Sequence, residues 1–403
     1  RRDMKHAIIA AILLALGGCT AKPGLAFTQL DYPMATQTVQ VGTAQIAYHD
    51  VGKGERTLVL IHGLGSYMPA WSRNVEALAK DYRVVVIDLP GYGKSTKANY
   101  DYSMRFFAKA VRGVVRQLGL QRVVLVGHSM GGQIAMTYAL DYPEELEALV
   151  LTAPAGLERF KDGEARWLAQ MTTPEFTCTA DDEAIYVRHS QNFYKMPREA
   201  EFMVRDRIAV RGGPDFESYC VAISRSVAGM LDQPVADRLR EIDVPTLVLF
   251  GEADSLIPNP FLHGGSTVRM AKKSVAELPD GELVVLEKAG HMAQFEQAHE
   301  WNRHVLSFLA AHDDAPKAGR THERAAAKPG STIEPLYAPG TDPDDEAKSA
   351  AAPAKVEPPP AKVEPSPPVD EPQIEPEPSV TPVAPADDDE PAVAAPPPSR
   401  SRT

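Results

Sequence analysis

The chain has 403 residues, a formal net charge of −12 and a hydrophobic content of 44%. No cluster of basic residues accompanies this acidic balance, so nothing in the sequence favours binding to nucleic acid. The three cysteines and eleven histidines are not spaced as metal ligands, and we predict neither a metal nor a cofactor.

The first predicted element is an export signal followed by a lipid attachment site. Lys5 precedes ten apolar residues, 7–16, about half the length that a membrane-spanning helix needs. Leu16-Gly17-Gly18-Cys19 follows and resembles the lipobox of bacterial lipoproteins, in which the cysteine becomes the acylated N-terminus. We expect a signal peptide over 1–18, a linker over 19–35, and anchoring in the cell envelope, at the outer membrane or periplasmic face, through lipidated Cys19. An ordinary signal peptide with an incidental cysteine is the alternative.

Between Thr36 and His312 the sequence alternates strand and helix patterns. Short runs rich in Val, Leu and Ile, bounded by Gly, Pro or Asp, are typical of parallel strands buried on both faces. These runs lie at 57–61, 83–88, 123–126, 146–151, 246–250 and 283–287. Helical patterns separate them, at 75–81, 105–118, 130–140 and 294–311. This order predicts a doubly wound, mostly parallel sheet of the α/β class.

Two segments depart from this alternation. Residues 38–51 are more polar and turn at Gly42, which predicts an antiparallel hairpin at one edge of the sheet. Residues 156–240 form a long helical stretch rich in aromatic, Met and Arg residues, which predicts a helical cap inserted between two strands. We expect most of its apolar side chains to form the core of the cap and a few to line an apolar pocket.

The pentapeptide Gly127-His128-Ser129-Met130-Gly131 carries the predicted chemistry. It directly follows the strand pattern at 123–126 and directly precedes a helix pattern, which is the context required for a nucleophile elbow. The turn is so tight that side chains at Gly127 and Gly131 would clash. It places the Ser129 hydroxyl at the carboxyl edge of the sheet, where open α/β sheets bind ligands.

A serine nucleophile needs a base, and the base needs an acid that orients it. Asp254 follows the strand pattern at 246–250, and His291 follows the one at 283–287, so both belong to the same sheet edge as Ser129. We therefore predict a catalytic triad of Ser129, Asp254 and His291. Asp88 and Glu252 are the alternative acids.

This arrangement resembles the α/β-hydrolase fold family over about residues 36–312, in the branch with a helical cap before the acid-bearing strand. Further matches are His62-Gly63-Leu64-Gly65 after the first parallel strand and the sequence 88–95, DLPGYGKS, after the next. The resemblance implies that the backbone N–H groups of Leu64 and Met130 form the oxyanion hole.

The resemblance also implies hydrolysis through an acyl-enzyme on Ser129. Because the predicted signal sends the chain to the envelope, we expect a small-molecule or lipid carboxylic ester as the substrate, as for an esterase or lipase. A carbon–carbon bond hydrolase of the same fold and a catalytically silent binding or scaffold protein are the alternatives.

Two further features stand outside the predicted site. Cys178 and Cys220 form either a disulfide or two separate buried thiols, and the sequence does not choose between them. Residues 313–403 contain 21 prolines, 18 acidic and 9 basic residues and a single aromatic, Tyr337. Such a segment buries too little apolar surface to offset its chain entropy, so we predict a disordered tail, for which the sequence identifies no partner.

Overall fold

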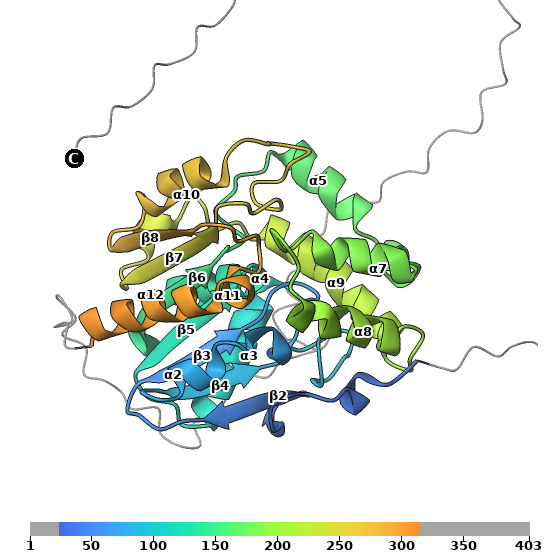
Figure 1. The fold of residues 1–403 in the computed structure, drawn as a ribbon, viewed down its shortest axis with the longest axis horizontal. Helices are drawn as coiled ribbons and strands as arrows, with labels where there is room; N and C mark the ends of the chain where they lie inside the picture. Colours follow the sequence, from blue (N-terminus) through green and yellow to red (C-terminus); the bar gives the residue numbers. More distant parts are fainter. Residues whose placement is uncertain (1–23, 314–403) are drawn as a thin grey trace, which may run out of the picture. The chain divides into compact units, whose positions relative to one another are not determined.

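The computed structural model describes residues 24–313 (Figure 1). The predicted signal peptide, the acylation of Cys19 and the predicted disorder of the tail after Asp313 lie outside the described residues, and they stay predictions. Within residues 24–313 no helix combines the length and hydrophobicity that a membrane span requires.

The centre of the fold is an eight-stranded sheet with the strand order β1-β2-β4-β3-β5-β6-β7-β8. The strands from β3 to β8 are parallel, whereas β1 and β2 form an antiparallel hairpin at one edge. The strands are β1 Gln37–Val41, β2 Ala44–Val51, β3 Thr57–Ile61, β4 Arg83–Ile87, β5 Val123–His128, β6 Leu146–Thr152, β7 Thr246–Gly251 and β8 Gly281–Leu286. Every residue of β3, β5 and β7 is buried, which explains their uninterrupted apolar sequences. The predicted α/β fold class is confirmed.

Helices cover the sheet on both sides of this core. The packed helices are α2 Val75–Leu78, α3 Met104–Gln117, α4 Met130–Asp141, α10 Thr267–Val275, α11 Ala293–Glu296 and α12 Ala298–Ala311. Short 3-10 turns lie at η1 Phe27–Gln29, η2 Met68–Trp71, η3 Pro143–Glu145, η4 Arg198–Ala200 and η5 Leu239–Glu241. The single helix predicted over 294–311 is two helices, because Gln297 has a non-helical backbone with φ of −113° and ψ of 47°.

The helical insertion lies between β6 and β7 and carries five helices (Figure 1). They are α5 Asp162–Met171, α6 Pro174–Cys178, α7 Asp182–Ser190, α8 Glu201–Val210 and α9 Phe216–Asp232. A disulfide between Cys178 and Cys220 joins α6 to α9, with 5.8 Å between the two Cα atoms. The two cysteines that the sequence left open are therefore paired, and the bridge fixes the outer helices of the cap to its longest helix.

Replacing both Cys178 and Cys220 with serine is expected to lower the free energy of unfolding by about 2–4 kcal/mol, because the disulfide reduces the conformational entropy of the unfolded chain. The bridge spans 42 residues. Urea denaturation with and without a reductant measures the effect. The reductant should lower the midpoint of the native chain and leave that of the double variant unchanged; equal midpoints for the two oxidised proteins would contradict the prediction.

The domain begins earlier in the chain than the predicted start at Thr36. Phe27, Leu30 and Tyr32 are buried, although they belong to the segment predicted as a linker. The Phe27 ring lies 4.9 Å from the ring of Tyr219 in the cap, and the Tyr32 hydroxyl donates to Asp88 at 2.9 Å. The described part of the predicted linker is thus packed against both the cap and the sheet.

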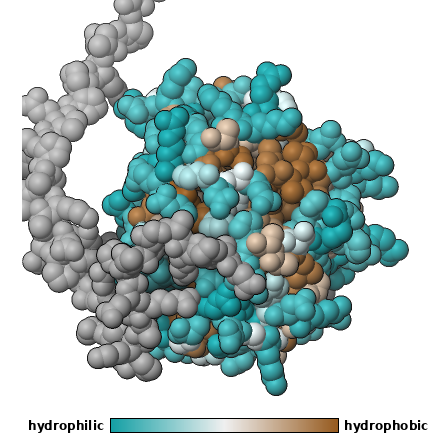
Figure 2. Space-filling model, turned by 90° about the vertical axis from the view of Figure 1, so that its left-hand side faces the viewer, coloured by the Kyte–Doolittle hydropathy of each residue, from teal (hydrophilic) through white to brown (hydrophobic). Residues whose placement is uncertain are grey.

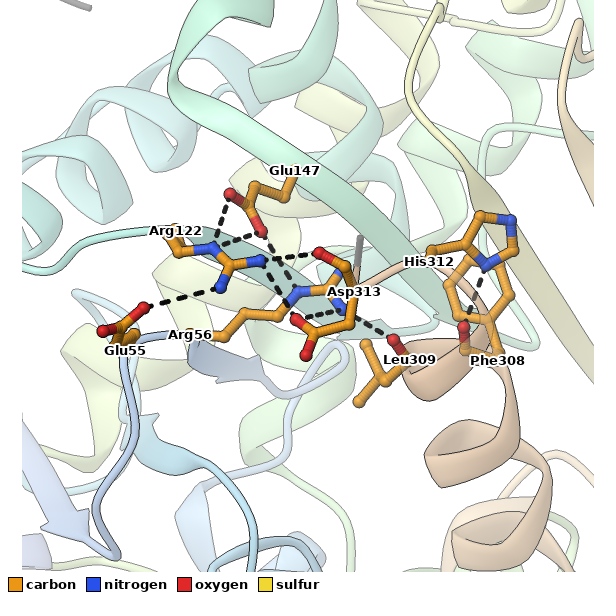
Figure 3. Close-up of polar contacts among 8 residues, drawn as sticks. All are labelled: Glu55, Arg56, Arg122, Glu147, Phe308, Leu309, His312 and Asp313. Carbon is orange, nitrogen blue, oxygen red and sulfur yellow. Dashed lines mark hydrogen bonds and ion pairs between the residues drawn. The ribbon is translucent and has the colours of Figure 1, made fainter. Parts of the chain in front are cut away.

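At the amino ends of the parallel strands a charged cluster ties the end of α12 to the sheet (Figure 3). Arg56 is almost fully buried; its Nη1 donates to the Leu309 carbonyl at 2.8 Å, and its Nε lies 3.2 Å from Glu147. Arg122 pairs with Glu147 at 3.0 Å and with Asp313 at 3.0 Å. This cluster lies at the edge of the sheet opposite the one that holds Ser129.

The surface is not uniformly hydrophilic. The face shown in Figure 2 carries apolar patches set among hydrophilic atoms. β8 is the last strand of the sheet, and its Leu283, Val284 and Val285 are only partly buried. Partly exposed apolar side chains therefore occur at the β8 edge of the sheet, and exposure alone does not identify a docking surface.

Candidate active site

Ser129 lies on a sharp turn between β5 and α4. Its backbone has φ of 52° and ψ of −118°, a conformation that L residues rarely adopt and that costs about 1–3 kcal/mol. The Ser129 N–H donates to the Thr152 carbonyl at 2.9 Å, which ties the turn to β6. A Cβ at Gly127 would lie 2.3 Å from the Gly131 carbonyl oxygen, and one at Gly131 would lie 2.4 Å from that of Ile61. The two glycines thus permit the turn that the sequence predicts.

His291 and Asp254 lie on the loops after β8 and β7 and are hydrogen-bonded to each other. His291 Nδ1 donates to Asp254 Oδ2 at 2.9 Å, and both side chains are almost completely buried. The other carboxylate oxygen accepts the N–H groups of Leu256 at 2.9 Å and Ile257 at 3.2 Å. This arrangement places the imidazole proton on Nδ1, which leaves Nε2 as the basic nitrogen.

The structure brings the predicted site residues to one place. Ser129, His291 and Leu64 line the same two cavities. Met130 is the first residue of α4, where a backbone N–H has no acceptor within the helix. Among residues 24–313 the N–H groups of Leu64 and Met130 have no hydrogen-bond acceptor. Both N–H groups therefore remain able to donate to a substrate oxygen.

The two alternative acids lie elsewhere. Asp88 accepts hydrogen bonds from the Tyr32 hydroxyl at 2.9 Å and from the N–H groups of Met68 and Lys94 at 2.7 Å each. Burial raises the pKa of Asp88 to about 6 despite these hydrogen bonds. Glu252 is exposed beside β7. Asp88 thus organises the loops after β3 and β4, and the carboxylate that orients His291 belongs to Asp254.

His128 is the residue whose role the sequence did not reveal. Its side chain is buried, its Nε2 donates to the His291 carbonyl at 3.0 Å, and the two imidazole rings lie 4.9 Å apart. Burial lowers the pKa of His128 well below its usual value, so the ring is neutral. The sequence offered one indication of this role: His128 is a polar residue at the last position of the buried strand β5. We infer that His128 positions the backbone of His291.

Replacing His128 with phenylalanine is expected to reduce kcat by about 10- to 100-fold with little change in KM, because His291 loses a fixed position. His128→Gln keeps an N–H donor of similar reach and should retain more activity. Steady-state kinetics on a soluble ester, beside thermal melts of both variants, make the comparison. Equal losses in the two variants would show that the hydrogen bond to the His291 carbonyl is not what matters.

The larger of the two cavities is apolar and has a volume of about 360 Å³. Ser129 and His291 lie on its wall. Most of the other lining residues belong to the cap or to the loop after β7 that carries Asp254, which we call the acid loop. Its apolar lining includes Phe160, Leu168, Val227, Met230, Leu231 and Ile257. No Lys or Arg is among its described lining residues, and its one acidic residue is Glu158. This cavity suits an uncharged, apolar group.

The smaller cavity, of about 100 Å³, is more polar and also reaches Ser129. Arg207 lines it, donates to the Gly65 carbonyl and lies over the Tyr219 ring at 4.4 Å. No carboxylate of the described residues forms an ion pair with Arg207. Burial lowers the pKa of His189, on the same wall, to about 4, so that ring is neutral. Asp206 lines the same cavity and accepts a hydrogen bond from the Tyr67 hydroxyl at 2.6 Å, so the cavity presents one arginine and one carboxylate.

A second polar cluster joins the acid loop to the cap beside the apolar cavity. His263 hydrogen-bonds to Glu158 through Nδ1 and to Glu164 through Nε2 at 3.1 Å. Burial alone would lower the pKa of His263, but these two carboxylates raise it. Within residues 24–313 no group of three His, Cys, Asp or Glu side chains is arranged to hold a metal ion. The cluster thus acts as a link between the loop and α5.

The comparisons with known proteins agree with this architecture. The sequence profile of the alpha/beta hydrolase fold matches residues 56–298. A 2-hydroxy-6-oxononadienedioate/2-hydroxy-6-oxononatrienedioate hydrolase from Burkholderia vietnamiensis is 32% identical over 292 residues, which cover 67% of this chain and 93% of the relative. A 2-hydroxy-6-oxo-6-phenylhexa-2,4-dienoate hydrolase from Burkholderia cepacia is 31% identical over 277 residues, 66% of this chain and 91% of the relative.

A solved structure gives the same result. The crystal structure of a probable hydrolytic enzyme from Pseudomonas aeruginosa superposes with a TM-score of 0.64 and 26% identity, and the match covers 71% of this chain and 98% of the other. With the profile match over most of the domain, these similarities show that the chain belongs to the α/β-hydrolase fold family and that it is related to hydrolases.

Proposed function

We propose that this protein is a serine hydrolase that cleaves carboxylic esters with an apolar acyl group through an acyl-enzyme on Ser129. The observation that carries the proposal is the apolar cavity of about 360 Å³ with Ser129 and His291 on its wall. An acyl chain bound there gains about 0.8 kcal/mol for each methylene that leaves water. Its carbonyl carbon is then held next to the Ser129 hydroxyl.

The proposed reaction has two halves, acylation and deacylation, which use the same site residues. His291 Nε2 takes the proton of the Ser129 hydroxyl while the oxygen attacks the ester carbonyl, and Asp254 stabilises the imidazolium that forms. The N–H groups of Leu64 and Met130 donate to the oxyanion, and each such donor is typically worth about 3 kcal/mol in the transition state. His291 then protonates the leaving alcohol, and a water molecule releases the acid by the same steps.

The proposal includes the predicted location. Acylation at Cys19 would hold the domain at an envelope membrane, outer or periplasmic, where lipid and ester substrates are available. The order Leu16-Gly17-Gly18-Cys19 supports it. Palmitate labelling of the native chain and of Cys19→Ser tests it: the label should disappear in the variant, and equal labelling would exclude acylation at this residue.

Carbon–carbon bond hydrolysis is the second candidate, and Arg207 is the observation that favours it. The relatives from Burkholderia are named for substrates that carry carboxylate groups. Arg207 in the smaller cavity suits one such group, although the Asp206 carboxylate on the same wall weakens the attraction. A dioate has a second carboxylate, however, which the apolar cavity with Glu158 on its wall would repel. A substrate with one carboxylate and one apolar end fits this candidate better.

A substrate series separates the two candidates. Nitrophenyl esters from acetate to palmitate are compared with a ring-fission diketone at equal enzyme concentration. We expect ester turnover to rise with chain length until the cavity is full and then to fall. Val227→Phe, which narrows the cavity, should shift the optimum to shorter chains. Negligible turnover of every ester together with efficient cleavage of the diketone would replace the ester proposal with the second candidate.

A further inference from the structure

We propose that the outer surface of the helical cap rests on the lipid bilayer, so that substrate enters the apolar cavity from the membrane side. The inference rests on the proposed function, from which it takes the acylation of Cys19 and the apolar cavity. We define the cap surface by its exposed apolar side chains. They are Trp167, Met171, Phe176, Tyr186 and Val187 of the cap helices and Leu25 of the N-terminal segment; two further exposed apolar residues, Tyr194 after α7 and Phe261 on the loop after β7, lie outside this definition.

The described residues begin at Gly24, and the position of this residue determines which face of the domain is closest to the proposed lipid anchor at Cys19. The Leu25 N–H donates to the Ala209 carbonyl of α8 at 2.7 Å, so the N-terminal segment is attached to the cap. Four residues, 20–23, separate Cys19 from Gly24. Fully extended, this connection spans about 17 Å. A domain of this size has a radius of gyration of about 19 Å, so the anchor reaches the bilayer only if the cap side of the domain faces it.

Contacts connect this attachment point to the rest of the cap surface. Arg211, just after α8, donates to the Ala180 carbonyl at 3.1 Å and pairs with Asp182 at 2.6 Å, which joins α8 to the start of α7. On α7, the Arg188 guanidinium lies over the Phe176 ring at 4.2 Å. In Figure 1 α5, α7 and α8 lie along one side of the domain, and the described chain begins beside α8. The cap surface is thus continuous with the attachment point.

The side chains on this surface suit a bilayer interface. The exposed fraction of each of the six residues lies between 41% and 54%. This is a large apolar exposure for neighbouring helices. Trp167 and Tyr186 combine an apolar ring with a polar atom, the chemistry that favours the boundary between headgroups and acyl chains. A bilayer would cover these side chains without a protein partner.

The cap surface also lies directly outside the proposed acyl cavity. On α5 Trp167 is exposed, whereas its neighbour Leu168 lines the cavity. Phe160, just before α5, lines the cavity as well. The same helix thus carries an exposed residue, Trp167, and a cavity-lining residue, Leu168. An ester in the leaflet next to α5 would have the cavity that holds Ser129 on the other side of this helix.

Trp167 makes the proposal measurable without labels. Trp71 and Trp301 are completely buried, so Trp167 is the exposed one of the three tryptophans. The acylated full chain is reconstituted into phosphatidylcholine vesicles with and without bromine on the acyl chains, which quenches only tryptophans in contact with lipid. We expect brominated vesicles to remove the Trp167 emission, about a third of the total if the three emit equally.

A matched variant moves the reporter to another face. The double variant Trp167→Phe/His299→Trp places the exposed tryptophan on α12, which packs against β7 and β8, and the His299 side chain is 90% exposed. Its emission should be the same in both kinds of vesicle. Quenching of the wild type alone supports the proposal. Vesicle-bound wild type without quenching, or equal quenching of both proteins, overturns it.

Two controls keep this result separate from the proposed function. Cys19→Ser should fail to co-sediment with the vesicles; if the wild type also fails to co-sediment, the anchor and the docking surface are both excluded. Hydrolysis of a soluble nitrophenyl ester should be equal in the wild type and the tryptophan variants. Loss of quenching with full hydrolysis would exclude the docking surface and leave the serine hydrolase proposal in place.

Discussion

Replacing Ser129 with alanine is expected to reduce ester hydrolysis by roughly 10⁴- to 10⁶-fold, because the reaction loses its nucleophile. The residual rate should come from the oxyanion donors and from substrate binding. Since Ser129 and His291 act as a unit, adding His291→Ala to Ser129→Ala should remove little more activity. Initial rates on the nitrophenyl ester with the best chain length give the comparison.

A serine of the same neighbourhood supplies the control for this variant. Ser255 follows Asp254 on the acid loop and is exposed, and its hydroxyl donates to the Gln191 carbonyl at 3.0 Å. Ser255→Ala should keep nearly all of the activity. If Ser129→Ala retained more than about a tenth of the wild-type rate, a nucleophilic role for Ser129 would be excluded.

Replacing Glu147 with glutamine is expected to destabilise the fold by about 3–5 kcal/mol. Glu147 faces Arg56 at 3.2 Å and Arg122 at 3.0 Å, and the Arg56 side chain is 3% exposed. The amide removes the negative charge and leaves a buried guanidinium that keeps a hydrogen bond to the Leu309 carbonyl and a longer ion pair with Asp313 at 3.8 Å (Figure 3). Denaturant titration followed by circular dichroism measures the change.

The control for Glu147→Gln is the same type of substitution at an exposed glutamate, Glu55. Glu55 lies 3.8 Å from Arg122, but its side chain is 91% exposed, so Glu55→Gln should change the stability by less than about 1 kcal/mol. Because the cluster lies at the sheet edge opposite Ser129, both variants should hydrolyse esters normally per folded molecule. Equal destabilisation by the two substitutions would show that burial of the Arg56 ion pair is not the cause.

The sequence was sufficient for those parts of the candidate site whose geometry follows from local order. The elbow at Ser129 could be predicted because its glycines, its preceding strand and its following helix are adjacent in the chain. The positions of Asp254 and His291 followed from parallel topology, which brings loops after the strands to one edge. The hydrogen bond between them identifies Asp254, and not Asp88, as the carboxylate that faces the histidine.

The features that the sequence did not reveal depend on contacts between distant segments. Pairing of Cys178 with Cys220 requires α6 to approach α9 within the cap. Phe27 is buried because the N-terminal segment reaches Tyr219. The contact of His128 with the His291 carbonyl joins the end of β5 to the loop after β8, 163 residues further along the chain. None of these distances is encoded in a local pattern of hydrophobicity or turns.

An activated serine at position 129 is central to the proposed function, and a fluorophosphonate probe tests for it directly. Such a probe forms a covalent bond with a serine only where a base and oxyanion donors activate it. Mass spectrometry of the labelled, digested protein should find one adduct, on the peptide that contains Ser129, and none in Ser129→Ala. A folded wild-type protein that remains unlabelled, or an adduct on another serine, would contradict the proposed function.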